Sequence, residues 1–231
     1  MNDTGGGSEM AEADPTVIAV IDDHQLLRAS LAAALEAEGY EIVAPALTEV
    51  GEVAAMLHKM RPAVALLDID LGPFGSGEDL LPTLQDLGAR VLVVSGQRDD
   101  AVVGRCLEAG AHGSVPKTAG IDELLDAVTK AAAGEPVLPV QERERLLDAW
   151  RERQRAVAES LAPFERLTRR EASVLGMLMA GRAVDRIARD CFVSTATVRT
   201  QVRSIFMKLG VRSQLEAVGK ANRAGWMPPG N

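Results

Sequence analysis

Short apolar runs alternate with amphipathic segments along the first 134 residues. Leu27, Leu31 and Leu35 illustrate the amphipathic kind, since they follow one another every four residues before Gly39. Apolar runs of four or five residues predict buried strands, and apolar positions three or four apart predict helices. The predicted strands are 17–21, 40–43, 64–67, 90–94 and 113–115, and the predicted helices are 25–38, 50–59, 78–87, 99–109 and 121–133.

Five strand–helix units in about 120 residues predict an α/β fold, a doubly wound five-stranded parallel sheet. We assign this domain to 16–134 and expect the preceding segment, 1–15, to be a disordered lead-in. That segment contains Gly5-Gly6-Gly7-Ser8 and acids, and it lacks the basic start and apolar core of a signal peptide.

A helical linker is predicted at 135–162, after Pro136 and Pro139 close the first domain. Within it, 141–161 carries a partly apolar stripe. Two interpretations stay open, a helix that packs on its own domain and a helix that pairs in a dimer, because three turns are too few to decide. The stripe consists of Leu147, Trp150, Gln154, Val157 and Leu161.

The last domain, 163–228, is predicted to be an all-α four-helix domain with helices at 169–180, 184–190, 195–209 and 214–224. Thr168 with Glu171, and Ser213 with Glu216, have the spacing of capping boxes. The second and third helices are joined by a tight turn and predict a helix-turn-helix.

Charge is distributed unevenly between these parts. The chain has 231 residues and a net charge of −8. Residues 16–138 carry −11, whereas 164–231 carry +7. An acidic body joined to a basic domain favours a regulatory part and a nucleic-acid-binding part over a chance fluctuation.

Two further features concern the compartment of the protein. No apolar run approaches the roughly 18 residues of a membrane span, so we expect no membrane contact. The two cysteines, Cys106 and Cys191, lie far apart without metal-ligand spacing. They are typical of core residues in a reducing cytoplasm, which is the predicted location.

Carboxylates end two of the predicted strands. Asp22 and Asp23 follow the first strand and Asp68 follows the third. Because the C-terminal ends of parallel strands share one rim, these groups should meet there and bind a divalent cation such as Mg²⁺. Asp68 is then placed to accept a phosphoryl group, with the Ser95 hydroxyl and the Lys117 ammonium on the same rim as donors to it.

The third helix of the basic domain has two distinct faces. Val198, Ile205 and Leu209 predict a core face, and Arg199, Thr200 and Arg203 lie opposite them. Such a face suits base contacts in a DNA major groove, although a solvated basic face would have the same charge. The cations expected to contact DNA phosphates are Arg182, Arg186, Arg189, Lys208 and Arg212.

With these residues in view, 17–133 resembles a response-regulator receiver domain. The resemblance implies that a sensor histidine kinase phosphorylates Asp68. It also implies that the pair in Asp22-Asp23-His24, with Asp68 and the backbone carbonyl of Asp70, binds Mg²⁺. Ser95 and Lys117 match the hydroxyl and lysine of that family.

The chain departs from the receiver pattern at three places. Ser114 stands where an aromatic switch residue is common, which puts the usual coupling from Ser95 in doubt. The loop 71–77 is longer and richer in glycine than the common form, and Pro116 precedes the matching lysine.

The region 163–227 resembles a LuxR-type domain. The matching segments are Leu167-Thr168-Arg169-Arg170-Glu171, Val193-Ser194-Thr195-Ala196-Thr197-Val198-Arg199 and Lys208-Leu209-Gly210-Val211-Arg212-Ser213. Together the two resemblances identify a response regulator of the NarL/FixJ type. They imply that Arg199, Thr200 and Arg203 contact bases of double-stranded promoter DNA, and that the active form is a homodimer. RNA polymerase is a further candidate partner.

Three alternatives remain. The chain could be a regulator that works without phosphorylation, or its helical domain could bind a protein partner. Asp68-Ile69-Asp70 also matches the Asp-x-Asp signature of haloacid-dehalogenase-type phosphatases. It follows the third strand and not the first, which disfavours an enzyme.

Overall fold

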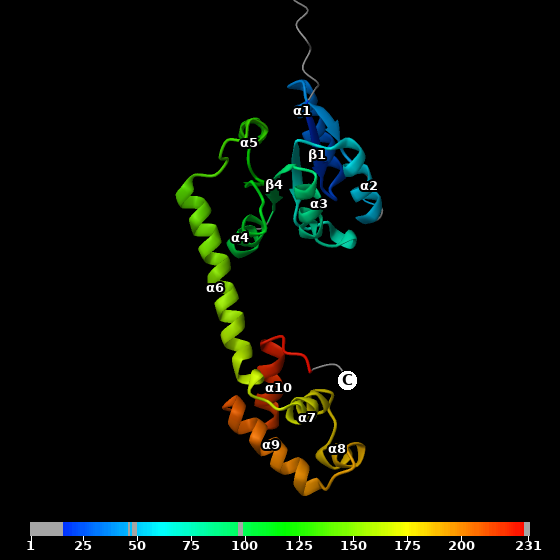
Figure 1. Cartoon of the computed structure of the whole chain (residues 1–231), viewed down its shortest axis with the longest axis vertical. Helices are drawn as coiled ribbons and strands as arrows, with labels where there is room; N and C mark the ends of the chain where they lie inside the picture. The colour runs from blue at the N-terminus through cyan, green and yellow to red at the C-terminus, as the bar shows by residue number, and fades with distance from the viewer. Residues whose placement is uncertain (1–15, 46, 48–49, 97–98, 229–231) are drawn as a thin grey trace, which may run out of the picture. The chain divides into compact units, whose positions relative to one another are not determined.

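The computed structural model describes residues 16–45, 47, 50–96 and 99–228, so the predicted lead-in at 1–15 lies outside the described residues. The chain separates into two compact units, Met1–Arg151 and Glu152–Asn231. The division falls inside one long helix, which contributes residues to both units (Figure 1). Each unit is described by itself.

The first unit is built on a five-stranded parallel sheet with the order β2-β1-β3-β4-β5. This confirms the predicted fold class. Because β1 lies between β2 and β3, the chain changes direction across the sheet at that point, and parallel sheets place their sites at the carboxyl ends of such strands. The strands are β1 (Val17–Ile21), β2 (Glu41–Val43), β3 (Val64–Asp68), β4 (Arg90–Ser95) and β5 (Gly113–Pro116).

Helices cover both faces of this sheet. The helices of the first unit are α1 (Gln25–Ala37), α2 (Val50–Met60), α3 (Leu81–Asp86), α4 (Asp100–Glu108) and α5 (Ile121–Ala133). Alternate strand residues point to opposite faces. Ala19 and Ile21 pack with residues of α2, α3 and α4, whereas Ile18 and Val20 pack with residues of α1 and α5.

The loop after β3 differs from the prediction. Instead of one helix over 78–87, the chain forms two 3₁₀ turns, η1 (Gly72–Phe74) and η2 (Gly77–Leu80), before α3. The loop folds back on β3, and the Gly77 amide donates to the carbonyl of Ile69 at 2.8 Å. A Cβ at Gly77 would overlap the Asp68 carbonyl, so glycine is required for this close approach. The loop thereby closes one side of the rim at Asp68.

The linker helix α6 (Val140–Glu165) is longer than predicted. Its first three turns pack on α4, where Leu146 is buried in the same core as Val103 and Leu107. Leu146 is the fully buried residue here, and Leu147 of the predicted stripe is partly buried and packs against the same core. For this part of α6, packing on its own domain is the interpretation that the structure supports.

The second unit is helical, with α7 (Arg169–Met179), α8 (Val184–Asp190), α9 (Thr195–Leu209) and α10 (Gln214–Arg223) after the end of α6. The capping box of Thr168 and Glu171 is present. The second predicted box is incomplete. The Ser213 hydroxyl accepts from the Glu216 amide, as a capping box requires. The Glu216 carboxylate, however, accepts from the Arg212 amide and not from the amide of Ser213.

Among the described residues, no helix is long and apolar enough to cross a membrane.

Candidate functional site

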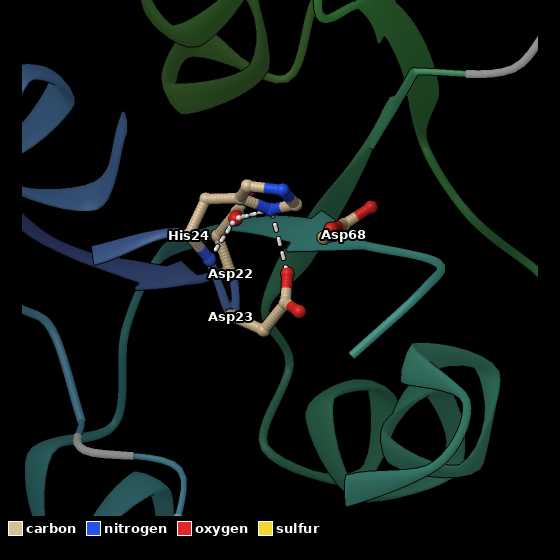
Figure 2. A group of neighbouring side chains, drawn as sticks. All are labelled: Asp22, Asp23, His24 and Asp68. Carbon is tan, nitrogen blue, oxygen red and sulfur yellow. Dashed lines mark hydrogen bonds and ion pairs between the residues drawn. The ribbon is translucent and has the colours of Figure 1, made fainter. Parts of the chain in front are cut away.

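Three aspartates and a histidine meet at the carboxyl ends of β1 and β3 (Figure 2). Asp22 and Asp68 are almost fully buried, at 2% and 3% exposure, whereas Asp23 is partly exposed. One ligand atom from each of the four side chains lies within 4.8 Å of the others. His24 Nδ1 lies 2.7 Å from Asp23 Oδ1 and 3.2 Å from Asp22 Oδ1. The predicted convergence of the strand ends is therefore observed.

Lys117, which follows β5, supplies a cation to this cluster. Its Nζ lies 2.5 Å from Asp68 Oδ2 and 2.8 Å from Asp22 Oδ2. Burial lowers the pKa of Lys117, but hydrogen bonds to Asp22 and Asp68 outweigh that effect and raise it above its ordinary value. Burial raises the pKa of Asp68, against the opposite influence of Lys117. The lysine therefore remains charged and offsets part of the carboxylate charge.

The donor set fits a hard divalent cation. Asp23 Oδ1 is a buried oxygen that accepts no well-aligned hydrogen bond from any described residue, although the His24 ring lies close to it. Buried carboxylate oxygens normally have a partner. An oxygen of this kind beside Asp22 and Asp68 is the ligand type that Mg²⁺ prefers.

An open cavity of about 450 Å³ lies over Asp68. Ser95, at the end of β4, and Lys117 line it, as the sequence predicted, and so does Asp70. The Asp70 amide lies 3.3 Å from Asp68 Oδ1. Two residues that the sequence analysis missed, Glu78 and Arg105, line the same cavity and form an ion pair.

Ser114 lies elsewhere. It lines a neighbouring cavity of about 470 Å³, between β5, α4 and the first turns of α6, and not the cavity over Asp68. Ser95 lines both cavities. Arg145 and Leu146 of α6 line this second cavity together with Ser114.

In the second unit, α9 presents the predicted polar face. Val198, Ile205 and Leu209 are buried in the core, and Arg199, Thr200 and Arg203 are exposed. Ser194 caps the helix by accepting from the Thr197 amide at 3.1 Å. A capped helix that follows α8 after a short turn has the geometry of a helix-turn-helix.

Three of the cations predicted to contact DNA phosphates have protein partners. Arg182 and Arg186 both pair with Asp190. Lys208 Nζ lies 2.6 Å from Glu171 Oε2, a buried carboxylate that also accepts from Ser204 and Thr168. Within the described part of the chain, Arg189 and Arg212 have no ion pair.

The fold and the pocket define a receiver-type domain, and comparison with known proteins agrees. Residues 18–129 match the response regulator receiver domain family. Residues 165–221 match the family of bacterial regulatory proteins named luxR.

Similar proteins span nearly the whole chain. The transcriptional regulatory protein LiaR of Bacillus subtilis is 30% identical over 208 residues, which cover 89% of this chain and 96% of LiaR. The nitrate/nitrite response regulator protein NarP of Escherichia coli is 33% identical and covers 90% of this chain and 95% of NarP. The chain therefore belongs to the response regulators of the NarL/FixJ type. LiaR is named a transcriptional regulatory protein and NarP a response regulator, so the family is one of regulators and not of enzymes, which removes the phosphatase alternative.

A solved structure shares the fold. Salmonella typhimurium RcsB, a response regulator, has a TM-score of 0.50 at 21% identity, with coverage of 91% of this chain and all of that one.

Proposed function

We propose that this protein is a transcription factor of a two-component system that a sensor histidine kinase phosphorylates on Asp68. The observation that supports this most directly is the cluster at the rim of the sheet, where Asp68 is buried beside Asp22 and Lys117 and opens onto a cavity. A phosphoryl acceptor needs an exposed approach, cations around the phosphoryl oxygens and fixed donors.

In the proposed reaction an Asp68 oxygen attacks the phosphorus of the kinase phosphohistidine, the P–N bond breaks, and the imidazole leaves with the electron pair and takes up a proton. Lys117 and Ser95 hold the phosphoryl oxygens. Asp22, Asp23, Asp68 and the Asp70 carbonyl would hold Mg²⁺, which neutralises charge on the transferred group. In this proposal the phosphoryl group on Asp68 persists as a signal and is not released as a reaction product.

We propose further that the second unit binds promoter DNA through α9. Arg199, Thr200 and Arg203 are exposed on one face and free to approach base edges. Among the cations, Arg189 and Arg212 are the stronger candidates for phosphate contacts, since Arg182, Arg186 and Lys208 already have protein partners. The RcsB–DNA complex among the similar structures supports this use of the fold. A cytoplasmic homodimer that binds two half-sites and contacts RNA polymerase completes the proposal.

Labelling with acetyl phosphate and Mg²⁺ tests the first step. On a phosphate-affinity gel, the wild-type chain should shift with a stoichiometry approaching one, and Asp68→Asn should not shift. Asp79→Asn is the matched control, since Asp79 lies in η2 and does not line the cavity. A shift of equal size in Asp68→Asn would contradict the assignment.

A further inference from the structure

Arg105 of α4 connects the cavity over Asp68 to the linker helix. On one side its guanidinium lines that cavity and pairs with Glu78. On the other side its Cζ lies 5.6 Å from the centre of the Trp150 ring in α6. A cation at this distance from an indole is in the range of a cation–π interaction.

The first three turns of α6 are attached to α4 by several contacts around this arginine. The Trp150 Nε1 donates to Glu108 Oε2 at 2.5 Å, and Arg145 Nη1 lies 2.5 Å from Asp100 Oδ2. Leu146 is buried between them. A Cβ on Gly104 would overlap the Leu146 carbonyl, so the two helix backbones approach as closely as only a glycine allows. A small displacement of α4 or of Arg105 must therefore change the contact with α6.

Charge gives a reason for such a displacement. Of the described residues that line the cavity, Lys117 and Arg105 are the two with permanently positive side chains, against four carboxylates. Lys117 is held between Asp22 and Asp68, whereas Arg105 is partly exposed and paired with one carboxylate. A guanidinium fork matches the oxygens of a phosphoryl group better than it matches a single carboxylate oxygen.

We propose that Arg105 is the residue that couples phosphorylation to the linker helix: it moves from Glu78 toward the phosphoryl group on Asp68 and so alters its contact with Trp150. This role rests on the proposed function of Asp68. Arg105 would connect the pocket to α6 in a chain where serine replaces the aromatic switch residue at position 114. Ser114 itself lines a cavity with residues from the same turns of α6. The linker helix, a segment continuous with the DNA-binding unit, is then the element whose equilibrium phosphorylation shifts.

Trp150 provides the measurement. The chain has two tryptophans, and the other, Trp226, stacks on Phe164 in the second unit with 5.2 Å between ring centres. Trp226→Phe retains an aromatic ring there and leaves Trp150 as the sole indole. Beryllofluoride with Mg²⁺, a stand-in for the phosphoryl group, should change the emission intensity of Trp150 in this protein. Arg105→Gln should abolish the change, and Arg105→Lys should reduce it.

Two controls separate this inference from the proposed function. Arg151 follows Trp150 in the chain, and its exposed guanidinium pairs with Asp148. Arg151→Gln should therefore leave the emission change intact. The acetyl-phosphate gel shift of wild type and of Arg105→Gln is measured alongside, and the emission changes are compared at saturating beryllofluoride. If that shift occurs but the emission change is absent from the parent, or persists fully in Arg105→Gln, the coupling role is wrong while phosphorylation stands. If neither the wild-type chain nor any of these variants is phosphorylated, both proposals fail.

Hydrogen exchange on the chain with both tryptophans gives an independent result. Peptides covering 143–151 should change their protection on addition of beryllofluoride in wild type and not in Arg105→Gln. Unchanged protection in both would overturn the inference even if Trp226→Phe disturbs the second unit.

Discussion

The ammonium of Lys117 lies 2.5 Å from Oδ2 of Asp68, although 49 residues separate them in the chain. The pair forms because β3 and β5 end at the same rim of a parallel sheet. With Asp22 2.8 Å from the same ammonium, one cation faces two buried carboxylates. These ion pairs stabilise the pocket. A phosphoryl group on Asp68 must change the contacts of the Lys117 ammonium.

Removal of Lys117 should therefore destabilise the first unit. In Lys117→Gln, Asp22 and Asp68 lose their shared cation, and the free energy of unfolding should fall by roughly 3 kcal/mol in EDTA, as for other broken buried pairs. Mg²⁺ should restore part of it by binding the same carboxylates. Urea unfolding followed by Trp150 emission, in the Trp226→Phe chain, measures both values. Lys130→Gln breaks an exposed pair with Asp126 and should cost well under about 1 kcal/mol. Equal losses in the two variants would contradict this account.

Glu171 should give the second unit a pH-dependent stability. Burial raises the pKa of this carboxyl, but hydrogen bonds from Lys208, Ser204 and Thr168 outweigh burial and lower it to about 2 from an ordinary 4.5. A folded-state pKa below the unfolded one stabilises the fold above pH 4.5, and the contribution is lost as pH falls from 4.5 toward 2. The shift corresponds to roughly 3 kcal/mol at neutral pH.

The measurement compares wild type with Glu171→Gln, each in a Trp150→Phe background so that Trp226 reports on the second unit. The difference in unfolding free energy should be largest above pH 5 and shrink below pH 4. Glu165→Gln, at the exposed end of α6, is the matched control. A difference that stays constant from pH 7 to pH 3 would be inconsistent with the pKa of Glu171.

Gly104→Ala should detach the first turns of α6 from α4. The added methyl would overlap the Leu146 carbonyl, so the helices must separate, although alanine favours a helix by about 1 kcal/mol over glycine. Faster hydrogen exchange is expected across 143–151. Gly219→Ala in α10 is the matched change, because its nearest neighbour is the movable Arg223 guanidinium, and it should be neutral or stabilising. Unaltered hydrogen exchange in Gly104→Ala would show that α4 and α6 do not pack as closely at Gly104 and Leu146 as described.

DNA-binding variants should separate into three kinds. Arg199→Gln should reduce the free energy of DNA binding by about 1–3 kcal/mol and relax the preference for particular bases. Arg189→Gln should weaken binding to all DNA sequences alike and lower the slope of log affinity against log salt concentration by about 1. Lys208→Gln should leave that slope unchanged, because its ammonium is paired with Glu171. Titrations of labelled promoter and unrelated DNA between low and moderate salt give both quantities. A reduced slope in Lys208→Gln would indicate that Lys208 does contact a DNA phosphate. Binding with no salt dependence in wild type would favour a protein partner.

The sequence was sufficient to predict the cluster around Asp68. Strand ends are visible as apolar runs, and a parallel sheet brings such ends together, so Asp22, Asp68, Ser95 and Lys117 could be assigned to one rim before their distances were known. The spacing of apolar residues similarly predicted which face of α9 carries Arg199 and Arg203.

Other features depend on packing that no local pattern encodes. Arg105 lies in the middle of a predicted helix, and its partner Glu78 lies in a 3₁₀ turn that the periodicity did not predict. Lys208 resembled every other basic residue of its domain, since its partner Glu171 lies 37 residues away. The deep burial of Leu146, which lies outside the predicted stripe, likewise accompanies the close approach of α6 to Gly104.

Promoter binding with and without a phosphoryl donor tests the central claim most directly. The affinity of wild type and Asp68→Asn for the same promoter fragment would be measured by anisotropy, each with Mg²⁺ and with or without acetyl phosphate. Phosphorylation of Asp68 as the controlling signal predicts that acetyl phosphate tightens binding by wild type and leaves Asp68→Asn unchanged. Equal tightening in both, or binding by wild type that ignores the donor while its phosphate-affinity gel shows full labelling, would contradict it.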